Sequence, residues 1–219
     1  MDSQIIILYE DEELIVCRKP AGVPVQTRSL MAQDMESYLK NYRCEKGEPP
    51  SIWVLHRLDQ PVCGVIAFAK TKEAASEISR QMAVRLTGKY YYAMTDGIVS
   101  KKKGTLEDYL LRDGRTNTSA VVSKGTAGAK LARLSYQVTE QGNGRSILKI
   151  WLETGRHHQI RVQLAHAGYP IVGDKKYNFR ENIASSGQKL ALCSYKISFR
   201  HPKTHKKLEF EIDKPFALS

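Results

Sequence analysis

Residues 133–152 read RLSYQVTEQGNGRSILKIWL. Leu134, Tyr136 and Val138 alternate with polar residues, which is the pattern of a strand with one buried face. The turn signal Gln141–Gly144 follows, and a second strand-like run comes directly after it. The stretch therefore predicts a β-hairpin, and hairpin strands pair antiparallel.

The pattern outside this hairpin predicts more strands than helices. A helix is expected where an apolar stripe begins at Met31, and another where Thr71 is a plausible N-cap and the stripe ends at Leu86. A third is expected over 156–167, closed by Gly168. Further strands are expected at 5–9, 14–18, 52–55, 65–69, 90–95, 119–122, 195–199 and 208–212, with loops over most of 100–130. Because the strands cluster, the sequence predicts a single α+β domain over 1–219, with a largely antiparallel mixed sheet and flanking helices.

Charge is spread unevenly along the chain. Lys plus Arg is 34 against 23 acidic residues, for a net charge of +11. Residues 1–50 carry a net −3, whereas residues 145–219 carry 14 basic and 6 acidic groups, or +8. The last third therefore suits a polyanion such as nucleic acid, although a basic surface that serves solubility is the alternative.

Several classes of protein are not indicated. No run approaches the roughly 20 apolar residues of a membrane helix, and a cytoplasmic location is expected. The four cysteines form no CxxC pair, so neither a zinc ribbon nor a disulfide framework is predicted. His157, His158 and His166 lack acidic residues at metal spacing, so no metal site is expected.

Four segments, in order along the chain, carry a family resemblance. They are Arg18-Lys19-Pro20-Ala21-Gly22-Val23; His56-Arg57-Leu58-Asp59, continuing through Gly64 to Thr71; Lys89-Tyr90-Tyr91-Tyr92-Ala93; and Glu153–Arg161, continuing to Gly173-Asp174. A weaker fifth block runs from Leu190 to Pro202. Together they resemble the RluA-type family of RNA pseudouridine synthases over about residues 5–212. The resemblance implies the catalytic fold of that family in its short form, with no separate RNA-binding domain.

The resemblance also implies the site. Asp59 would be the catalytic carboxylate, Arg161 its counter-charge, and Tyr91 the aromatic residue that lies against the uracil ring. Ile160 and Leu192 would supply the apolar pocket. The family uses no cofactor and no metal, and the partner expected for a monomer of this kind is structured RNA, either tRNA or rRNA.

The chemistry explains why one carboxylate suffices. The N1–C1′ bond of uridine breaks, the uracil turns, and C5 bonds to C1′. Glycosidases usually use two carboxylates, one of which activates water or attacks the sugar. A synthase must recapture the uracil, so one carboxylate in a dry pocket suits it better. Attack by Asp59 on C1′, addition to the ring and removal of the C2′ proton all stay open.

Basic and polar residues around these motifs are the candidate RNA contacts. Arg57 lies beside Asp59 and is expected to fill the gap left by a flipped base or to grip a phosphate. The other candidates lie at the start of the third helix and beyond its end: Arg156, His158, Gln159, Lys175 and Lys176.

The chain departs from the family at four positions. Val62-Cys63 replaces the common Thr-Ser before Gly64, His157 stands where Thr is common, and Cys193 where His is common. These changes leave the carboxylate, the aromatic residue and the arginine in place. Two other functions stay open: an RNA-binding factor without activity on the same scaffold, and a glycosidase that releases uracil.

Overall fold

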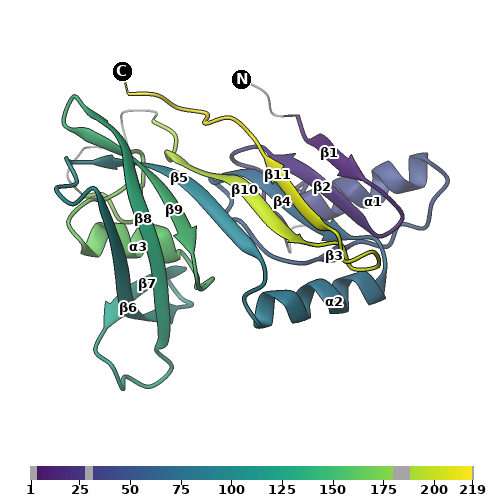
Figure 1. Cartoon of the computed structure of the whole chain (residues 1–219), viewed down its shortest axis with the longest axis horizontal. Helices are drawn as coiled ribbons and strands as arrows, with labels where there is room; N and C mark the ends of the chain where they lie inside the picture. The colour runs from purple at the N-terminus through teal and green to yellow at the C-terminus, as the bar shows by residue number, and fades with distance from the viewer. Residues whose placement is uncertain (1–3, 28–31, 180–187, 219) are drawn as a thin grey trace. The chain divides into compact units, whose positions relative to one another are not determined.

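The computed structural model describes residues 4–27, 32–179 and 188–218. The chain divides into two compact units (Figure 1). The first comprises Met1–Lys89 and Ser194–Asp213, and the second comprises Tyr90–Cys193 and Lys214–Ser219. The single domain that the sequence predicts stays a prediction.

The first unit combines a small sheet with two helices. Its elements are β1 (Ile6–Glu10), β2 (Leu14–Lys19), α1 (Met35–Glu45), β3 (Trp53–Val54), β4 (Cys63–Ala69), α2 (Lys72–Ala83), most of β10 (Leu192–Arg200) and β11 (Lys207–Glu211). The strand order is β1-β2-β4-β10, with β3 paired to β4 and β11 to β10. β1 pairs antiparallel with β2, and β2 with β4. The hairpin predicted near the C-terminus is confirmed as β10–β11.

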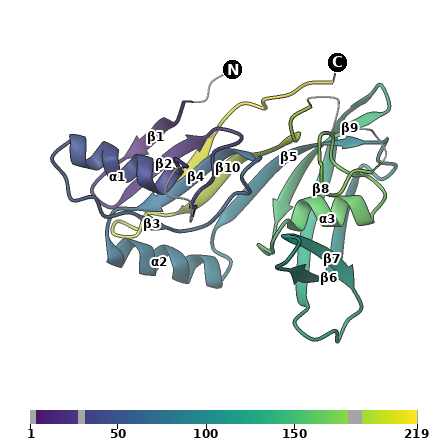
Figure 2. The same cartoon turned by 180° about the vertical axis from the view of Figure 1, so that it is seen from behind.

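The two helices explain why the central strands are apolar throughout. Every residue of β4 after Cys63 is buried, so both faces of the strand are covered. Figures 1 and 2 show α1 and α2 on opposite faces of this sheet. On one face, Ala74 and Ile78 of α2 pack with Val65 and Ala67 of the sheet.

Both predicted helices of the first unit form, with shifted bounds. α1 begins at Met35 after a capping box, in which Asp34 accepts from the Ser37 backbone N–H at 2.8 Å. Met31 lies outside the described residues. Thr71 caps α2 as expected, but the helix ends at Ala83, and Leu86 is 56% exposed rather than part of the apolar stripe.

The second unit is an antiparallel sheet backed by one helix. Its elements are β5 (Gly88–Asp96, from Tyr90 on), β6 (Lys103–Asp113), β7 (Thr118–Val122), β8 (Lys130–Gly142), β9 (Arg145–Leu152) and α3 (Gln159–His166), in the strand order β5-β9-β8-β6-β7. Val162 of α3 packs against Leu110 and Ala132 of the sheet. The α+β class with a largely antiparallel sheet is therefore confirmed.

The hairpin that opened the sequence analysis is confirmed as β8–β9. Asn143 and Gly144 have φ angles of 50° and 72°, which suits the tight turn that the Asn-Gly pair predicts. The expectation of loops over 100–130 was wrong for β6, an 11-residue strand between β8 and β7. Lys103 and Gly104 obscure the alternation of the strand in the sequence. Hydrogen bonding to β7 on one side and to β8 on the other stabilises β6 as a strand.

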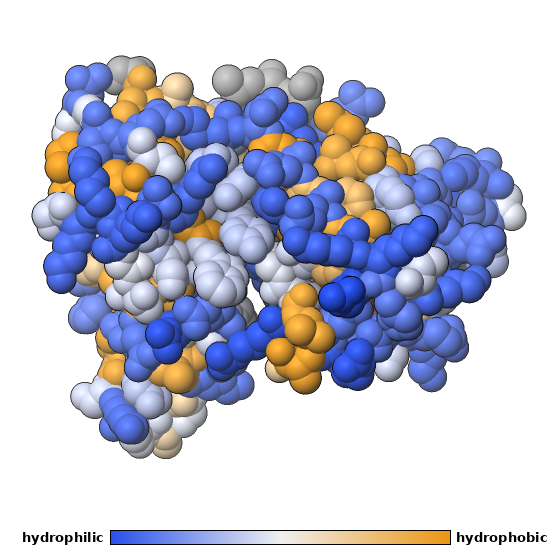
Figure 3. All heavy atoms as spheres, viewed as in Figure 1, coloured by the Kyte–Doolittle hydropathy of each residue, from blue (hydrophilic) through white to orange (hydrophobic). Residues whose placement is uncertain are grey.

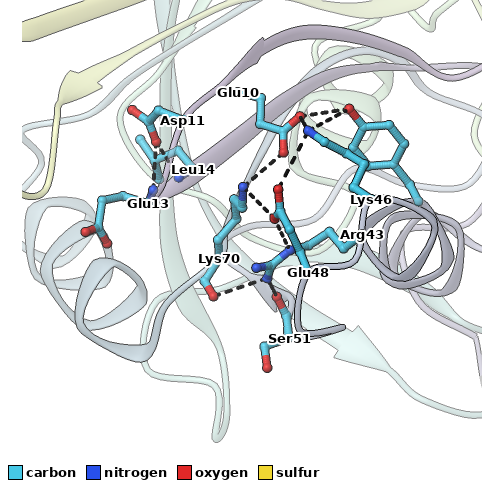
Figure 4. A network of polar contacts seen from close by, with 10 residues as sticks. Glu10, Asp11, Glu13, Leu14, Arg43, Lys46, Glu48, Ser51 and Lys70 are labelled. Carbon is cyan, nitrogen blue, oxygen red and sulfur yellow. Dashed lines mark hydrogen bonds and ion pairs between the residues drawn. The ribbon is translucent and has the colours of Figure 1, made fainter.

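A network of charged side chains joins α1 to the sheet of the first unit (Figure 4). Lys70 is 8% exposed and lies between two carboxylates, 3.0 Å from Glu10 and 2.9 Å from Glu48. Glu10 also receives hydrogen bonds from Tyr42 at 2.8 Å and from Lys46 at 2.9 Å. Burial by itself raises the pKa of Glu10, but these donors outweigh it and lower the pKa to about 2.

We predict that Glu10→Gln loses stability at neutral pH and little in acid. The pKa of Glu10 is about 2 in the folded state against 4.5 in the reference state, so its contribution is present above pH 4.5 and is lost as pH falls toward 2. Urea unfolding at pH 7 should show a loss of about 1–3 kcal/mol, and less at pH 3. The exposed Glu12→Gln is the control, and an equal loss at both pH values would contradict the prediction.

Candidate active site

Asp59 lies in the loop that joins β3 to β4 in the first unit. Leu58 beside it is buried, with 6% of its surface exposed. The backbone N–H of Val62 donates to the Asp59 carbonyl oxygen at 3.0 Å and closes a turn. On the other side, His56 Nε2 accepts from the Ala67 N–H at 3.3 Å, beyond the end of β3. The loop is therefore tied to the sheet on both sides of Asp59.

His56 is an acceptor and not a second acid. Burial, which is the larger cause, and the nearby positive charge of Lys89 together lower its pKa to about 3. The imidazole is therefore neutral at pH 7, which agrees with its acceptance of the Ala67 N–H. We infer that it serves to hold the loop in place.

The side chain of Lys19 anchors the same loop through hydrogen bonds. Its side chain is fully buried, and its ammonium donates to the carbonyl oxygens of Pro20 at 3.0 Å, Val23 at 2.6 Å and Gln60 at 3.0 Å. Gln60 is the neighbour of Asp59, and its carbonyl also accepts from the Gly22 N–H at 2.8 Å. The Lys19 ammonium therefore joins the first motif of the sequence to the residue that follows Asp59.

The surroundings of Lys19 shift its pKa in two directions. Burial lowers the pKa of Lys19 to about 8, while Cys63 and Asp59 act in the opposite direction. No role is predicted for Lys19 from the sequence, although it lies in the motif Arg18–Val23. A lysine in a motif carries no sign of burial, so only the folded structure shows that it organises the loop.

Gly64 is required where the loop enters β4. Its φ is 131°, and a Cβ built there would lie 2.2 Å from the Ser194 carbonyl oxygen. Any larger residue would push β10 away from β4. Of the two unusual residues before it, Val62 is buried at 2% exposed and Cys63 is partly exposed.

The other predicted catalytic and pocket residues belong to the second unit. Tyr91 lies on β5, opposite Ile150 of β9, and is 6% exposed. Leu192 at the start of β10 is 3% exposed, and Ile160 on α3 is 4% exposed. All three side chains are buried, and the apolar pocket that they would form stays a prediction.

Arg161 forms a buried, two-pronged ion pair with Asp174. Its Nε donates to Asp174 Oδ2 at 2.8 Å and its Nη2 to Oδ1 at 2.7 Å. The arginine is 4% exposed and the aspartate is fully buried. The guanidinium also lies 5.2 Å from the centre of the Tyr177 ring. This geometry fixes both the position and the orientation of the Arg161 charge.

Asp174 is the residue of this group that the sequence analysis missed. It was quoted in the Gly173-Asp174 motif without a role, and the expected partner of Arg161 was Asp59. Pairing between residues 13 positions apart, one on a helix and one beyond it, has no periodic signal in the sequence. The pairing of Arg161 with Asp59 stays a prediction.

The start of α3 differs from the expected helix over 156–167. His158 has a φ of 53°, a left-handed conformation that separates the turn before it from the helix that begins at Gln159. The Gln159 side chain accepts from the Arg156 N–H at 2.9 Å and donates to the Arg133 carbonyl oxygen at 3.1 Å. Gln159 is 3% exposed. We therefore assign it to the stability of this turn and leave it out of the proposed RNA surface.

The helix ends as the sequence predicts. Gly168 has a φ of 87° and donates its N–H to the Ala165 carbonyl oxygen at 3.0 Å. The Tyr169 N–H reaches back to Leu164 at 2.9 Å, which completes a Schellman motif.

The two adjacent histidines take structural positions. Their rings stack with centroids 3.8 Å apart. His158 Nδ1 lies 2.7 Å from the Tyr177 hydroxyl, and His158 is 7% exposed. His157 Nδ1 lies 3.0 Å from Ser119 Oγ, and its Nε2 lies 3.1 Å from Asn117 Oδ1. The unusual His157 therefore fastens β7 and its preceding turn to the start of α3.

The remaining candidate RNA-binding residues differ in their solvent exposure. Arg57, Arg156 and Lys175 are exposed. Lys176 is partly buried and its ammonium donates to the Asn117 carbonyl oxygen at 2.6 Å. Arg156 keeps one hydrogen bond, from Nε to the Leu131 carbonyl oxygen at 2.8 Å. These four side chains can offer positive charge to a ligand.

Two negative findings bear on the class of protein. Among residues 4–27, 32–179 and 188–218, no group of three or more His, Cys, Asp or Glu residues is arranged to hold a metal ion. Within the same described ranges, none of the helices has the length and apolar character needed to cross a membrane.

Comparison with known proteins assigns the family. The model of a family described as RNA pseudouridylate synthase matches residues 13–166. The Dual-specificity RNA pseudouridine synthase RluA of Vibrio cholerae is 32% identical over 204 residues, which cover 93% of this chain and 80% of that protein. Ribosomal large subunit pseudouridine synthase D of Neisseria meningitidis serogroup B is 32% identical over 219 residues, but the match covers only 58% of its length.

A solved structure supports the fold independently. Human RNA Pseudouridylate Synthase Domain Containing 1 superposes with a TM-score of 0.80, covering 98% of this chain and 85% of that one, at 22% identity. The chain belongs to the RluA-type family of RNA pseudouridine synthases. It is accordingly an isomerase, and the resemblance stated from its motifs is confirmed.

We predict that Lys19→Met destabilises the first unit and slows turnover. Methionine preserves length but removes the ammonium from which three carbonyl oxygens accept, and only the Gln60 oxygen keeps another donor, the Gly22 N–H; the loss should cost about 2–4 kcal/mol in urea unfolding. Turnover should fall at least about tenfold because the neighbour of Asp59 loses its anchor. The partly exposed Lys40→Met is the control, with an expected effect of about 0.5 kcal/mol or less.

The pH dependence gives Lys19 a signature of its own. Because its folded pKa is about 8 and its reference value is 10.5, the unfolded chain holds the extra proton between these values. Stability from this group therefore rises with pH between about 8 and 10.5. The rise should be missing in Lys19→Met. Identical pH profiles for the two proteins would count against a buried, titrating Lys19.

We predict that Asp174→Asn costs about 3 kcal/mol of unfolding free energy, because it leaves the Arg161 charge buried without its carboxylate. Turnover should fall at least about tenfold as the guanidinium loses its orientation. Asp113→Asn, at a partly exposed position in the same unit, is the matched control. A stable and fully active Asp174→Asn enzyme would show that this ion pair is dispensable.

Proposed function

We propose that this enzyme isomerises specific uridines in structured RNA, with Asp59 as its one catalytic carboxylate and with the target base flipped out. The observation that carries the proposal is the way the Asp59 loop is held. Lys19 anchors it from the first motif, His56 from the end of β3, and Gly64 from its contact with β10. A loop anchored from three sides suits a side chain whose position must be exact to within fractions of an ångström.

The reaction conserves every atom of the RNA chain except one exchanged hydrogen. The N1–C1′ bond breaks, the uracil turns, C5 bonds to C1′, the hydrogen from C5 passes to solvent, and N1 takes up a proton from solvent. Asp59 would act by attack on C1′, by addition to the ring, or by removal of the C2′ proton. No cofactor or metal enters this proposal. A second carboxylate that activated a water molecule would instead lead to hydrolysis and to the release of uracil.

The residues of the second unit have complementary roles in the proposal. Arg161 would supply the positive charge that keeps the Asp59 carboxylate ionised beside an apolar base. Tyr91 would lie against the uracil ring, with Ile160 and Leu192 as its apolar surroundings. The ion pair with Asp174 supports this role of Arg161, since it would pre-orient the guanidinium at no cost during the reaction.

The proposed substrate is tRNA or rRNA. The relative from Vibrio cholerae is described as dual-specificity, and the one from Neisseria meningitidis as acting on the large ribosomal subunit. The net charge of +8 over residues 145–219 favours a polyanion, and Arg57, Arg156, Lys175 and Lys176 are the proposed phosphate contacts. A base in folded RNA must leave its stack to be reached, and Arg57 would fill the gap. A monomeric state and a cytoplasmic location stay predictions.

Tritium release from RNA labelled at C5 of uridine tests the proposal against its alternatives. The proposed synthase releases tritium and no free uracil. A glycosidase would release free uracil, and an RNA-binding factor would release neither. Absence of tritium release from both tRNA and rRNA would overturn the proposal.

We predict that Asp59→Asn abolishes this tritium release while RNA affinity stays within about tenfold of wild type, because phosphate contacts dominate binding. Asp113→Asn, a change at a partly exposed residue at the end of β6, should behave as wild type in both assays. Retention of a few per cent of wild-type turnover by Asp59→Asn would contradict its assignment as the catalytic carboxylate.

A further inference from the structure

We propose that the turn from Gly173 to Phe179 is a second RNA-binding site, at which the Phe179 ring stacks on an unpaired base. Lys175 and Lys176 would hold the phosphates beside that base. The inference rests on the proposed function in taking RNA as the ligand, and it adds the Phe179 ring to the phosphate contacts already proposed at Lys175 and Lys176.

Phe179 stands out among the exposed apolar residues of the described structure. It is 86% exposed, whereas Leu86 is 56%, Val84 55%, Trp151 48% and Ile98 47% exposed. Figure 3 shows one face of the molecule, where apolar residues lie scattered among hydrophilic ones. Scattered apolar residues are ordinary on protein surfaces. Exposure alone therefore does not mark a site, and the setting of Phe179 has to carry the argument.

The turn that presents Phe179 is tightly built. Asp174 accepts hydrogen bonds from the Lys176 N–H at 3.0 Å and the Tyr177 N–H at 3.3 Å, and its carbonyl oxygen accepts from the Asn178 N–H at 3.0 Å. At Gly173 the φ is 74°, and a Cβ there would lie 2.3 Å from the Lys189 carbonyl oxygen. These contacts hold the backbone of the turn in place.

Side chains secure the turn on both sides of the lysines. The Tyr177 hydroxyl accepts from the Ser119 N–H at 2.8 Å. Asn178, next to Phe179, is 4% exposed, and its Nδ2 donates to Asp96 Oδ2 at 3.2 Å and to the Ile171 carbonyl oxygen at 3.3 Å. An anchored residue thus precedes an exposed aromatic ring. The backbone that leads into Phe179 is therefore held in place, which lowers the conformational cost of binding at this position.

The charge of the turn is positive where it meets solvent. Asp174 is its one acidic residue, and this carboxylate is fully buried and paired with Arg161. Lys175 is exposed, and Lys176 is partly exposed with its ammonium 2.6 Å from the Asn117 carbonyl oxygen. The surface of the turn therefore offers cations without a competing carboxylate of its own.

This combination fits RNA better than a protein partner. Aromatic rings beside lysines are the usual means of binding unpaired nucleotides, because every base has a face that stacks and every nucleotide a phosphate. The solvent-facing neighbours of Phe179 within this turn are Lys175, which is exposed, and Lys176, which is partly exposed, and these cations suit phosphates better than an apolar protein surface. The same Asp174 that shapes the turn also orients Arg161, so the proposed site and the proposed catalytic arginine share one carboxylate.

Binding to two simple RNA probes tests the inference without relying on turnover. The probes are a 20-nucleotide oligouridylate and an RNA duplex of 20 base pairs, titrated by fluorescence anisotropy. Phe179→Ala should bind the oligouridylate about 5- to 30-fold more weakly, since one stacked base is lost, and should bind the duplex within about twofold of wild type. Phe179→Tyr, which keeps the ring, should retain the wild-type affinity.

Controls separate stacking from charge and from surface apolarity. Ile98→Ala removes another exposed apolar side chain of the second unit and should leave both affinities and tritium release unchanged. Lys175→Gln should weaken both probes and reduce the slope of log K against log salt by about 0.7–0.9. Phe179→Ala should leave that slope as it is, because the ring carries no charge.

Each other outcome has a defined meaning. Equal oligouridylate binding by Phe179→Ala and wild type would overturn the inference. So would a change in sedimentation of Phe179→Ala that reveals a lost protein–protein contact. If wild type releases no tritium from RNA while the Phe179→Ala binding defect persists, then the proposed function fails and the binding site stands.

Discussion

The buried pair of Arg161 and Asp174 is the interaction on which most of the second unit's functional features depend. It joins α3 to the turn that follows it, and it does so with two short hydrogen bonds in the interior. Burying two charges is costly, so a pair of this kind is weak evidence for stability as such. Its value lies in orientation, because a planar guanidinium held at two atoms can point its remaining donors in one direction only.

The first unit solves a similar problem with a lysine instead of an arginine. Lys19 holds three backbone carbonyl oxygens around one ammonium, and the loop that contains Asp59 is built on that contact. The two units therefore organise their functional residues through buried cations that are themselves supported from within the same unit. In each case the residues stand in the family motifs, but the motifs do not show which residues contact each other.

The sequence allowed most of the regular elements to be predicted. Alternating apolar residues revealed β8, β10 and β11, because a strand that buries one face has a period of two, and the turn signal at Gln141–Gly144 revealed β9. The caps of α2 and α3 followed from Thr71 and Gly168, whose chemistry acts locally. β6 was not predicted because its strand conformation depends on pairing with β7 and β8 and has no clear signal in its own residues. α3 began three residues late because His158 takes a left-handed conformation that residue type does not announce.

By itself, the sequence determined the family, the α+β class and the identity of Asp59, Tyr91 and Arg161 as the residues to examine. Periodicity gives the fold class because it reflects contacts close along the chain, whereas the family and these three residues come from the resemblance of the motifs to the RluA-type family. The tertiary structure decided that Lys19 is fully buried, that Asp174 holds Arg161, and that Phe179 is exposed on an anchored turn. Burial and partner choice depend on residues distant in sequence, so only the folded chain could assign them.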